Sequence, residues 1–133
     1  MRAVTKAKAI MTDSALVLAI CGVAASFLPQ EILAVIGGPP HVVMTAIVQL
    51  LGALLLAFAM VDWMAKDSLI GGIYNRAVAV GNLVHFAVGA ITLIKLALPG
   101  GAPRYLLVAA VVYVVFTAAF ATLVFGTGVT RHD

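Results

Sequence analysis

The stretch VVMTAIVQLLGALLLAFAM, residues 42–60, decides the fold of this chain, because it carries no charged side chain over a length that matches a bilayer. A helix needs roughly 20 consecutive apolar residues to cross the hydrocarbon core. The whole chain has the same character: of its 133 residues, 64% are hydrophobic and 10% are charged, whereas about 45–50% of residues are apolar in soluble domains. The sequence therefore predicts an integral membrane protein.

Apolar runs of similar character occur three more times, and the four predicted spans are residues 14–28, 42–60, 77–98 and 105–125. The connections are short, which makes consecutive spans antiparallel. The stretch QEILAVIGG, residues 30–38, has a helical pattern that stops at Gly37 and Gly38, which predicts a short interfacial helix in the first outer loop. Residues 1–133 hold no internal repeat. We predict an all-α fold with a single domain, a four-transmembrane-helix antiparallel bundle.

The basic residues predict the orientation of the chain. Four spans place both termini and the middle loop on one side, which then holds Arg2, Lys6, Lys8, Lys66, Arg76 and Arg131. The other side holds Lys95 and Arg104. The positive-inside rule predicts that both termini are cytoplasmic. The net charge of +3 is thus a topology signal, and we predict no nucleic-acid partner.

Small residues predict which faces of the spans pack together, because helices in a membrane associate through close approach and a few polar contacts. The predicted stripes, span by span, are Ala15, Ala19, Gly22 and Ser26; Thr45, Gln49, Ala53 and Ala57; Gly81, His85 and Gly89; and Ala109, Tyr113, Thr117 and Ala121. We predict close packing at four glycines, which are Gly22, Gly52, Gly81 and Gly89.

Polar residues within the spans are predicted to form two layers. With a rise of about 1.5 Å per residue, Cys21, His85 and Thr117 lie roughly 10 Å from the cytoplasmic ends. Gln49, Tyr113 and Thr92 form the second layer, nearer the outside. The candidate ligand-binding residues are His85, Asn82, Gln49, Tyr113, Thr117 and Cys21. Structural roles are the alternative: Gln49 and Tyr113 form interhelical hydrogen bonds, and Cys21 acts as a small buried hydrophobe.

His85 is the strongest of these candidates, because an ionisable group inside a membrane is costly and suggests a function. Asn82 lies one turn earlier and is placed to orient the imidazole ring by a hydrogen bond. Gly81 and Gly89, four residues to either side, leave bare backbone that a partner helix or a flat ring can approach. Three roles stay open for His85: a hydrogen bond to a neighbouring helix, contact with a ligand or pigment, and proton handling.

Charged residues near the span ends have simpler interpretations. We predict that Asp13 caps a helix beside Thr12 and Ser14. Lys95 is close enough to the outer end of its span to reach the headgroups. Asp62 and Lys66 are four residues apart in the favourable order, which predicts that the second span continues by one turn.

The sequence lacks the residues that several kinds of transport and catalysis require. All carboxylates, Asp13, Glu31, Asp62, Asp67 and Asp133, map to ends or loops, whereas proton-coupled four-helix exporters need one within the membrane. No paired carboxylates, nucleophile and base, or metal-ligand cluster stands out, so we predict a non-catalytic protein without a metal site. His41 and His132 lie far from His85, which excludes a bis-histidine haem within one protomer. A single axial ligand, or a site shared by two copies, stays open, and pigment, haem and quinone are the cofactors considered.

Two stretches, FLPQEILAVIGGPP (residues 27–40) and VQLLGALLLAFAMVDWMAK (residues 48–66), are similar to the DoxX-like group of small bacterial four-helix membrane proteins. In that group a proline-led outer helix precedes a second span rich in Leu, Gly and Ala. GGIYNR (residues 71–76) and GNLVHF (residues 81–86) also resemble segments of bacterial membrane proteins. The resemblance covers the first half of the chain and implies a four-helix bundle in the bacterial inner membrane, associated with other membrane or redox proteins. It implies no catalytic residue.

Three hypotheses for the function follow. In the first, a non-catalytic membrane protein binds a partner protein, or a hydrophobic molecule such as a lipid or quinone, within the bundle. In the second, it is an accessory subunit of a respiratory or photosynthetic complex and holds a pigment or haem through His85. In the third, it is a carrier of protons or solutes that depends on His85. In all three the bilayer is a partner, and a membrane-protein partner or a second copy of the chain stays open.

Overall fold

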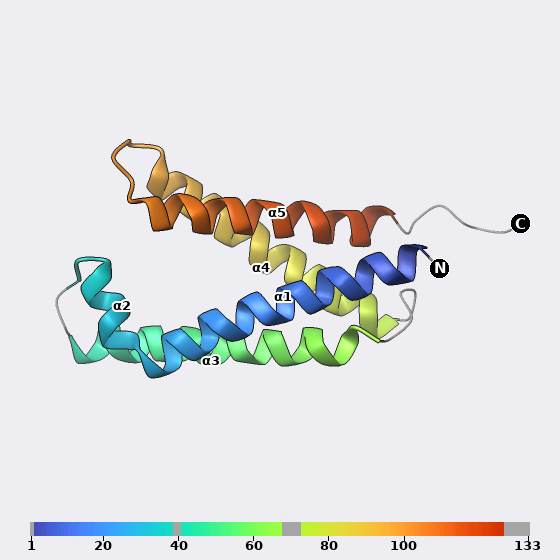
Figure 1. Cartoon of the computed structure of the whole chain (residues 1–133), viewed down its shortest axis with the longest axis horizontal. Helices are drawn as coiled ribbons and strands as arrows, with labels where there is room; N and C mark the ends of the chain where they lie inside the picture. The colour runs from blue at the N-terminus through green and yellow to red at the C-terminus, as the bar shows by residue number, and fades with distance from the viewer. Residues whose placement is uncertain (1, 39–40, 68–72, 127–133) are drawn as a thin grey trace, which may run out of the picture. The chain divides into compact units, whose positions relative to one another are not determined.

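The computed structural model describes residues 2–38, 41–67 and 73–126, and within these ranges all regular structure is helical. The helices are α1 (Arg2–Phe27), α2 (Pro29–Val35), α3 (Val42–Ala65), α4 (Ile73–Ala97) and α5 (Arg104–Gly126) (Figure 1). All except α2 are long and apolar enough to span a membrane. The chain is therefore a multi-pass integral membrane protein. The predicted all-α class, with four membrane-length helices and a short helix between the first two, is confirmed.

The helices extend beyond the predicted spans, most of all at the start of the chain. Helix α1 begins at Arg2, so Asp13 lies inside it and the predicted cap at Asp13 is wrong. Residues 2–12 contain Ala, Lys and Met, which favour helix and continue it past the apolar run. Helix α3 runs to Ala65, which agrees with the extra turn predicted from Asp62 and Lys66.

The chain divides into two compact units. Unit 1 comprises Met1–Ile10 and Ser68–Asp133, and unit 2 comprises Met11–Asp67. The single domain over residues 1–133 stays a prediction. Arg131, His132 and Asp133, which entered the orientation, haem and carboxylate arguments, lie outside the described residues.

In unit 2, α1 and α3 run antiparallel and approach closely at two glycines (Figure 1). A Cβ atom added to Gly22 would lie 2.9 Å from the backbone nitrogen of Leu56. One added to Gly52 would lie 2.6 Å from the backbone nitrogen of Ser26. Only glycine lets the two backbones come this close.

The short helix α2 packs on α3 and buries Pro29 and Leu33. It ends in a Schellman motif, in which the Gly38 N–H donates to the Leu33 carbonyl at 2.9 Å. Gly37 has the positive φ of 76° that this motif requires. The positive φ of Gly37 and the hydrogen bond of Gly38 thus explain why the helix ends at the two glycines, as predicted.

The packed face agrees with the prediction on α1 but not on α3. On α1, Ala15 and Gly22 are buried, and Ala19 and Ser26 are half-buried. On α3, Gln49, Ala53 and Ala57 are exposed, whereas Gly52, Leu55, Ala59, Asp62 and Ala65 are buried. The predicted α3 face is thus wrong. Small residues occur on both sides of this helix. The side that packs against α1 is the one with Gly52, which makes the close contact, and with the buried Asp62.

In unit 1, α4 and α5 form an antiparallel hairpin. Gly100 and Gly101 make the turn with φ of 84° and 73°. The core is aromatic: the Phe86 and Phe120 side chains are fully buried, and Phe86 stacks on Phe116 and Phe120 at centroid distances of 4.8 and 5.7 Å.

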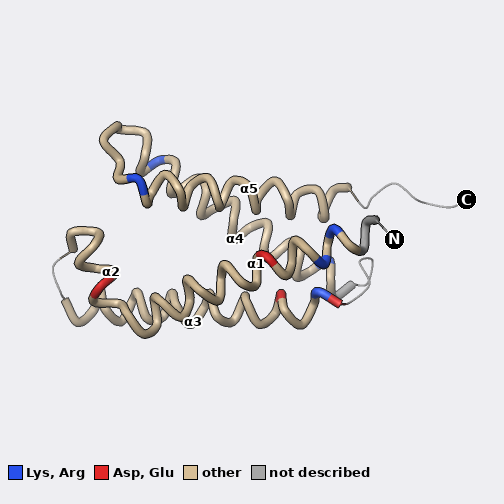
Figure 2. The backbone as a smooth tube through the Cα atoms, in the orientation of Figure 1, with Lys and Arg blue, Asp and Glu red and all other residues tan. Residues whose placement is uncertain are grey.

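Several charged residues lie near the ends of the spans, but Asp13 lies eight residues inside the Thr5–Phe27 span and is exposed. The prediction that all carboxylates map to ends or loops is therefore wrong for Asp13, because α1 starts well before the predicted span. Figure 2 shows basic residues on both sides of the turn between α4 and α5, which are Lys95 in the last turn of α4 and Arg104 at the start of α5. In unit 2, Glu31 lies in the first turn of α2, and Asp62, Lys66 and Asp67 lie where α3 ends. The orientation drawn from the basic residues stays a prediction.

Candidate functional site

His85 lies at the centre of α4, equally far from Ile73 and Ala97. At 1.5 Å per residue the imidazole is about 18 Å from each end of the helix, deeper than the predicted 10 Å. The difference arises because α4 begins at Ile73, one turn before the predicted start of the span. His85 thus occupies the middle of a membrane-length helix.

The partner of His85 is Tyr113 on α5. The Tyr113 hydroxyl lies 3.4 Å from His85 Nε2, and the ring centroids are 5.6 Å apart. This distance is at the long end for a hydrogen bond, and both side chains are half-buried. The pair is a polar contact between two helices. This is the structural role that we gave as the alternative to ligand binding for both residues.

Packing holds the two rings in place. The Phe86 ring contacts both His85 and Tyr113 edge to face, at centroid distances of 5.0 and 5.2 Å. A Cβ atom added to Gly89 would overlap the Tyr113 ring, so glycine makes room for the tyrosine. Gly81, on the other side of His85, is half-buried.

The other sequence candidates make contacts within their own helices or belong to the other unit. Asn82 is fully buried and its side-chain nitrogen donates to the Val78 carbonyl at 3.1 Å. The Thr117 hydroxyl donates to the Tyr113 carbonyl in its own helix at 2.7 Å. Gln49 and Cys21 belong to unit 2 and are exposed. Cys21 is therefore not the small buried hydrophobe that its structural alternative describes.

The polar residues of unit 1 do not form two separate layers as predicted. Tyr113 and His85 were placed in different layers, yet they contact each other. The depth estimate counted Cα positions and left out the length of the tyrosine side chain, which bridges the difference in height. Thr92, also assigned to the outer layer, donates to the Val88 carbonyl of its own helix at 2.9 Å. Whether His85, Asn82, Gln49, Tyr113, Thr117 and Cys21 bind a ligand stays a prediction.

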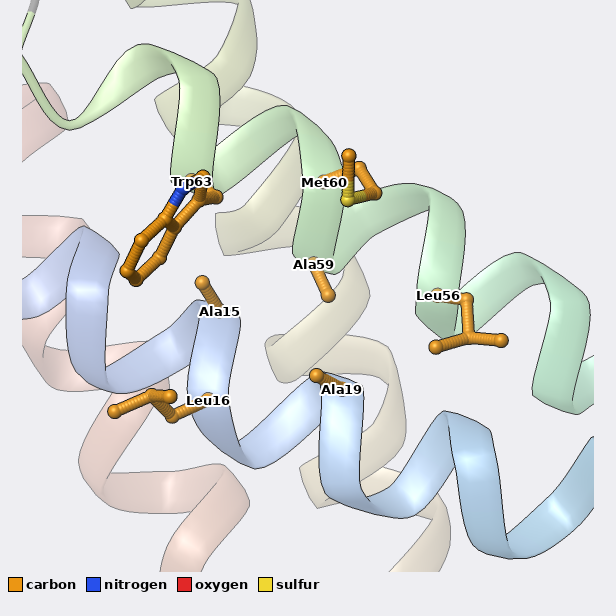
Figure 3. Close-up of a pocket in the computed structure, with 7 residues that line it drawn as sticks. All are labelled: Ala15, Leu16, Ala19, Leu56, Ala59, Met60 and Trp63. Atoms are coloured by element: carbon orange, nitrogen blue, oxygen red, sulfur yellow. The ribbon is translucent and has the colours of Figure 1, made fainter.

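A groove between α1 and α3, which we call the α1–α3 groove, lies in unit 2 and was not predicted (Figure 3). Its volume is about 350 Å³, and it is lined by Ala15, Leu16, Ala19, Leu56, Ala59, Met60 and Trp63. In Figure 3 the alanines form the floor between the two helices, and the larger side chains stand around it. The sequence feature that could have indicated the groove is the set of small residues Ala15 and Ala19 on α1 and Ala59 on α3. We missed it because we assigned the opposite face of α3 to the interior.

A buried polar pair borders the groove. Ser14, next to Ala15, donates a hydrogen bond of 2.6 Å to the Asp62 carboxylate, next to Trp63. Both side chains are fully buried. Asp62 does lie near a helix end, as predicted, but it is not solvated there: it is a buried ionisable group that joins α1 to α3.

A cation lies at the same end of the groove. The Lys66 Nζ atom is 2.9 Å from the centroid of the Trp63 ring, a cation–π contact. Trp63 itself is 47% exposed. Tryptophan with a basic neighbour at the end of a span is typical of the membrane interface.

The positions of the histidines and of the other possible metal ligands can be compared within the described part of the chain. Within residues 2–38, 41–67 and 73–126, no three His, Cys, Asp or Glu side chains gather to hold a metal ion. His41 serves as the N-cap of α3, where its Nδ1 accepts from the Val43 N–H at 3.3 Å. The Nε2 atom of His85 faces Tyr113, so an axial ligand role would require the tyrosine hydroxyl to move.

Comparison of the chain with protein-family models, curated proteins and solved structures finds no match. The similarity to DoxX-like proteins therefore stays a prediction carried by its own sequence motifs.

Proposed function

We propose that this integral membrane protein is non-catalytic and binds the acyl chain of a membrane lipid in the α1–α3 groove. The observation that carries the proposal is the groove itself, about 350 Å³ of space lined by apolar side chains from two membrane-length helices. Ligand sites in proteins range from about 300 to 1,000 Å³. The groove is at the small end of this range, as suits one chain of a lipid.

The lining favours a hydrocarbon chain over a quinone ring. Among the seven lining side chains, the Trp63 indole is the only one that can donate a hydrogen bond. A quinone head would need donors for its carbonyl oxygens. Along α3 the groove runs from Leu56 to Trp63, about 10 Å at 1.5 Å per residue. An elongated, apolar occupant matches this shape.

Packing supplies the affinity in this proposal, because hydrophobicity does not drive association inside a bilayer. Ala15 and Ala59 are buried and form a smooth floor, whereas Leu16 and Met60 are exposed at the rim. A chain lying in the groove gains van der Waals contacts on its sides. Neighbouring lipids on a convex helix surface lack these side walls.

Trp63 provides a built-in reporter, since it is the only tryptophan of the chain and lines the groove. The experiment reconstitutes the protein in phosphatidylcholine vesicles that contain a phosphatidylcholine with dibrominated acyl chains, and records the quenching of Trp63 fluorescence. In Ala19→Leu the added side chain fills the groove at a half-buried position. We expect quenching to fall by at least half in this variant.

The matched control is Ala57→Leu, the same substitution at an exposed position of α3 outside the groove. We expect it to quench as the wild type does. Equal quenching in the wild type and Ala19→Leu would show that Trp63 senses only bulk lipid, and the proposal would fail. Circular dichroism of all three proteins checks that the helices are intact.

The orientation and setting belong to the same proposal. The side that holds both termini has six basic residues against two on the other side, which supports cytoplasmic termini. The proline-led helix α2 after the first span is the feature that the DoxX-like resemblance describes, and it supports the bacterial inner membrane. Labelling of single cysteines placed in the loops of a Cys21→Ala background, from either side of a sealed membrane, tests the orientation.

A pigment or haem held by His85 in an accessory subunit is the second candidate, favoured by the mid-span position of His85. A carrier that depends on His85 is the third. The absorbance spectrum between the near ultraviolet and the near infrared, taken on protein from its native membrane and on His85→Ala, tests the second candidate. A pH-dependent flux in vesicles that is lost in His85→Ala tests the third. A visible band that is lost in the variant would favour the accessory subunit.

A further inference from the structure

The turn between α4 and α5 holds two basic side chains at one end of unit 1. Lys95 lies in the last turn of α4, and Arg104 is the first residue of α5. Figure 2 shows them on both sides of the turn, and both are exposed. Gly100 and Gly101 keep the connection short through their positive φ. Two cations are therefore held at the same end of one hairpin.

Acidic partners for these cations do not occur in the described part of their own unit. Residues 2–10 and 73–126, which are the described residues of unit 1, contain no Asp or Glu. Lys66 is the only basic residue in the sequence of unit 2, and all acidic residues of the chain except Asp133 belong to that unit. The described part of unit 1 thus does not neutralise the charge of the turn.

Helix electrostatics explains Lys95 but not Arg104. A cation in the last turn of a helix stabilises the negative end of the helix dipole, whereas a cation in the first turn opposes the positive end. The first turn of α5 has no acidic residue that would offset Arg104. The predicted orientation also places this turn outside, where basic residues are disfavoured. An anion at the turn would offset both the guanidinium group and the positive end of α5.

The neighbouring side chains indicate that this anion is a lipid headgroup. Tyr105, next to Arg104, is 46% exposed, and tyrosine favours the headgroup level of a membrane. Leu98 and Leu107 are also exposed on the two sides of the turn. We infer that the α4–α5 turn binds an anionic phospholipid, whose phosphate contacts Lys95 and Arg104 and whose acyl chains lie along the exposed leucines. A zwitterionic lipid would add a positive charge to this basic site.

A tryptophan placed beside the turn reports which lipid occupies it. The protein carries Trp63→Phe, which removes its only native tryptophan, and Leu98→Trp, at a side chain that is 75% exposed. Phosphatidylcholine vesicles contain equal fractions of either dibrominated phosphatidylglycerol or dibrominated phosphatidylcholine, at low ionic strength. The ratio of the two quenching efficiencies measures the headgroup preference. We expect phosphatidylglycerol to quench about threefold more, the size of effect that exposed charges produce.

Charge-removing variants assign the preference to the turn. When Lys95→Gln and Arg104→Gln are combined, we expect the ratio to fall to one, whereas Arg104→Lys keeps the charge and should keep the ratio above one. The matched control combines Lys6→Gln and Arg76→Gln, which remove the same charge from exposed positions near the starts of α1 and α4. Arg76 is about 28 Å from Lys95 along α4, so the control should leave the ratio unchanged. Circular dichroism checks that the helices of each variant are intact.

Three outcomes would overturn the inference. The first is a ratio of one in the protein that keeps Lys95 and Arg104. The second is an equal fall of the ratio in the control, which would assign the preference to the overall charge of the protein. The third concerns a free anion: if sodium phosphate removes the preference but sodium chloride of the same ionic strength does not, the turn binds phosphate and not a lipid. The turn belongs to unit 1, so these results are independent of the α1–α3 groove and of Ala19→Leu.

Discussion

Gly52→Ala is the sharpest test of the packing between α1 and α3. The added methyl group would lie 2.6 Å from the Ser26 backbone nitrogen and 2.9 Å from the Ala25 carbonyl carbon. Backbone atoms cannot rotate away as a side chain can, so the two helices have to separate. Overpacking of this kind costs about 1–3 kcal/mol, while the change from glycine to alanine within a helix returns up to about 1 kcal/mol. We expect a net loss of about 1–2 kcal/mol.

The assay is reversible unfolding in mixed micelles with increasing mole fraction of dodecyl sulfate, followed by circular dichroism and Trp63 fluorescence. Gly126→Ala is the control, because nothing lies within 4 Å of a Cβ atom added there. It should be neutral or slightly stabilising. If Gly52→Ala is as stable as the wild type or more stable, α1 and α3 do not approach at Gly52 and our account of unit 2 is wrong.

Two polar contacts give further predictions. Ser14→Ala removes the hydroxyl that donates to the buried Asp62 carboxylate, and we expect the free energy of unfolding to fall by about 1–2 kcal/mol. The same micelle titration measures it, and a loss smaller than that of an exposed Thr92→Ala control would contradict the assignment. Tyr113→Phe removes a long contact to His85 but keeps the aromatic packing, so we expect a loss of about 0.6 kcal/mol or less. A loss above about 2 kcal/mol would show that this pair is a major stabilising contact.

The sequence predicted the features that depend on composition and on local signals. The four long helices follow from the apolar runs, and the end of α2 follows from Gly37, whose positive φ leads into the Schellman motif. Bounds were less accurate because α1 continues through residues 2–12, where helix-forming residues are mixed with lysines. Local preference was enough for these features, since each depends on neighbours in the chain.

The candidate site was harder to predict because it depends on which faces meet. Both sides of α3 carry small residues, so composition did not distinguish Ala53 and Ala57 from Gly52 and Ala59. The buried state of Asp62 depends on Ser14, 48 residues earlier, which no local pattern connects to it. His85 and Tyr113 were both identified, but their contact depends on the reach of the tyrosine side chain. Pairings of this kind become visible only once the helices are placed side by side.

The contacts between α1 and α3 at the two ends of the groove determine how a molecule can enter it. Gly22 and Gly52 hold the backbones together beyond Ala19, and the Ser14–Asp62 hydrogen bond holds them beyond Ala15. The two helices are therefore held together at both ends of the groove, and we expect an occupant to enter through its lateral opening toward the surrounding leaflet. Leu16 and Met60, which are 50% and 60% exposed, stand at that lateral opening. Exchange would then require only the rotation of these two side chains, on the nanosecond timescale typical of exposed rotamers, with both helices staying in place.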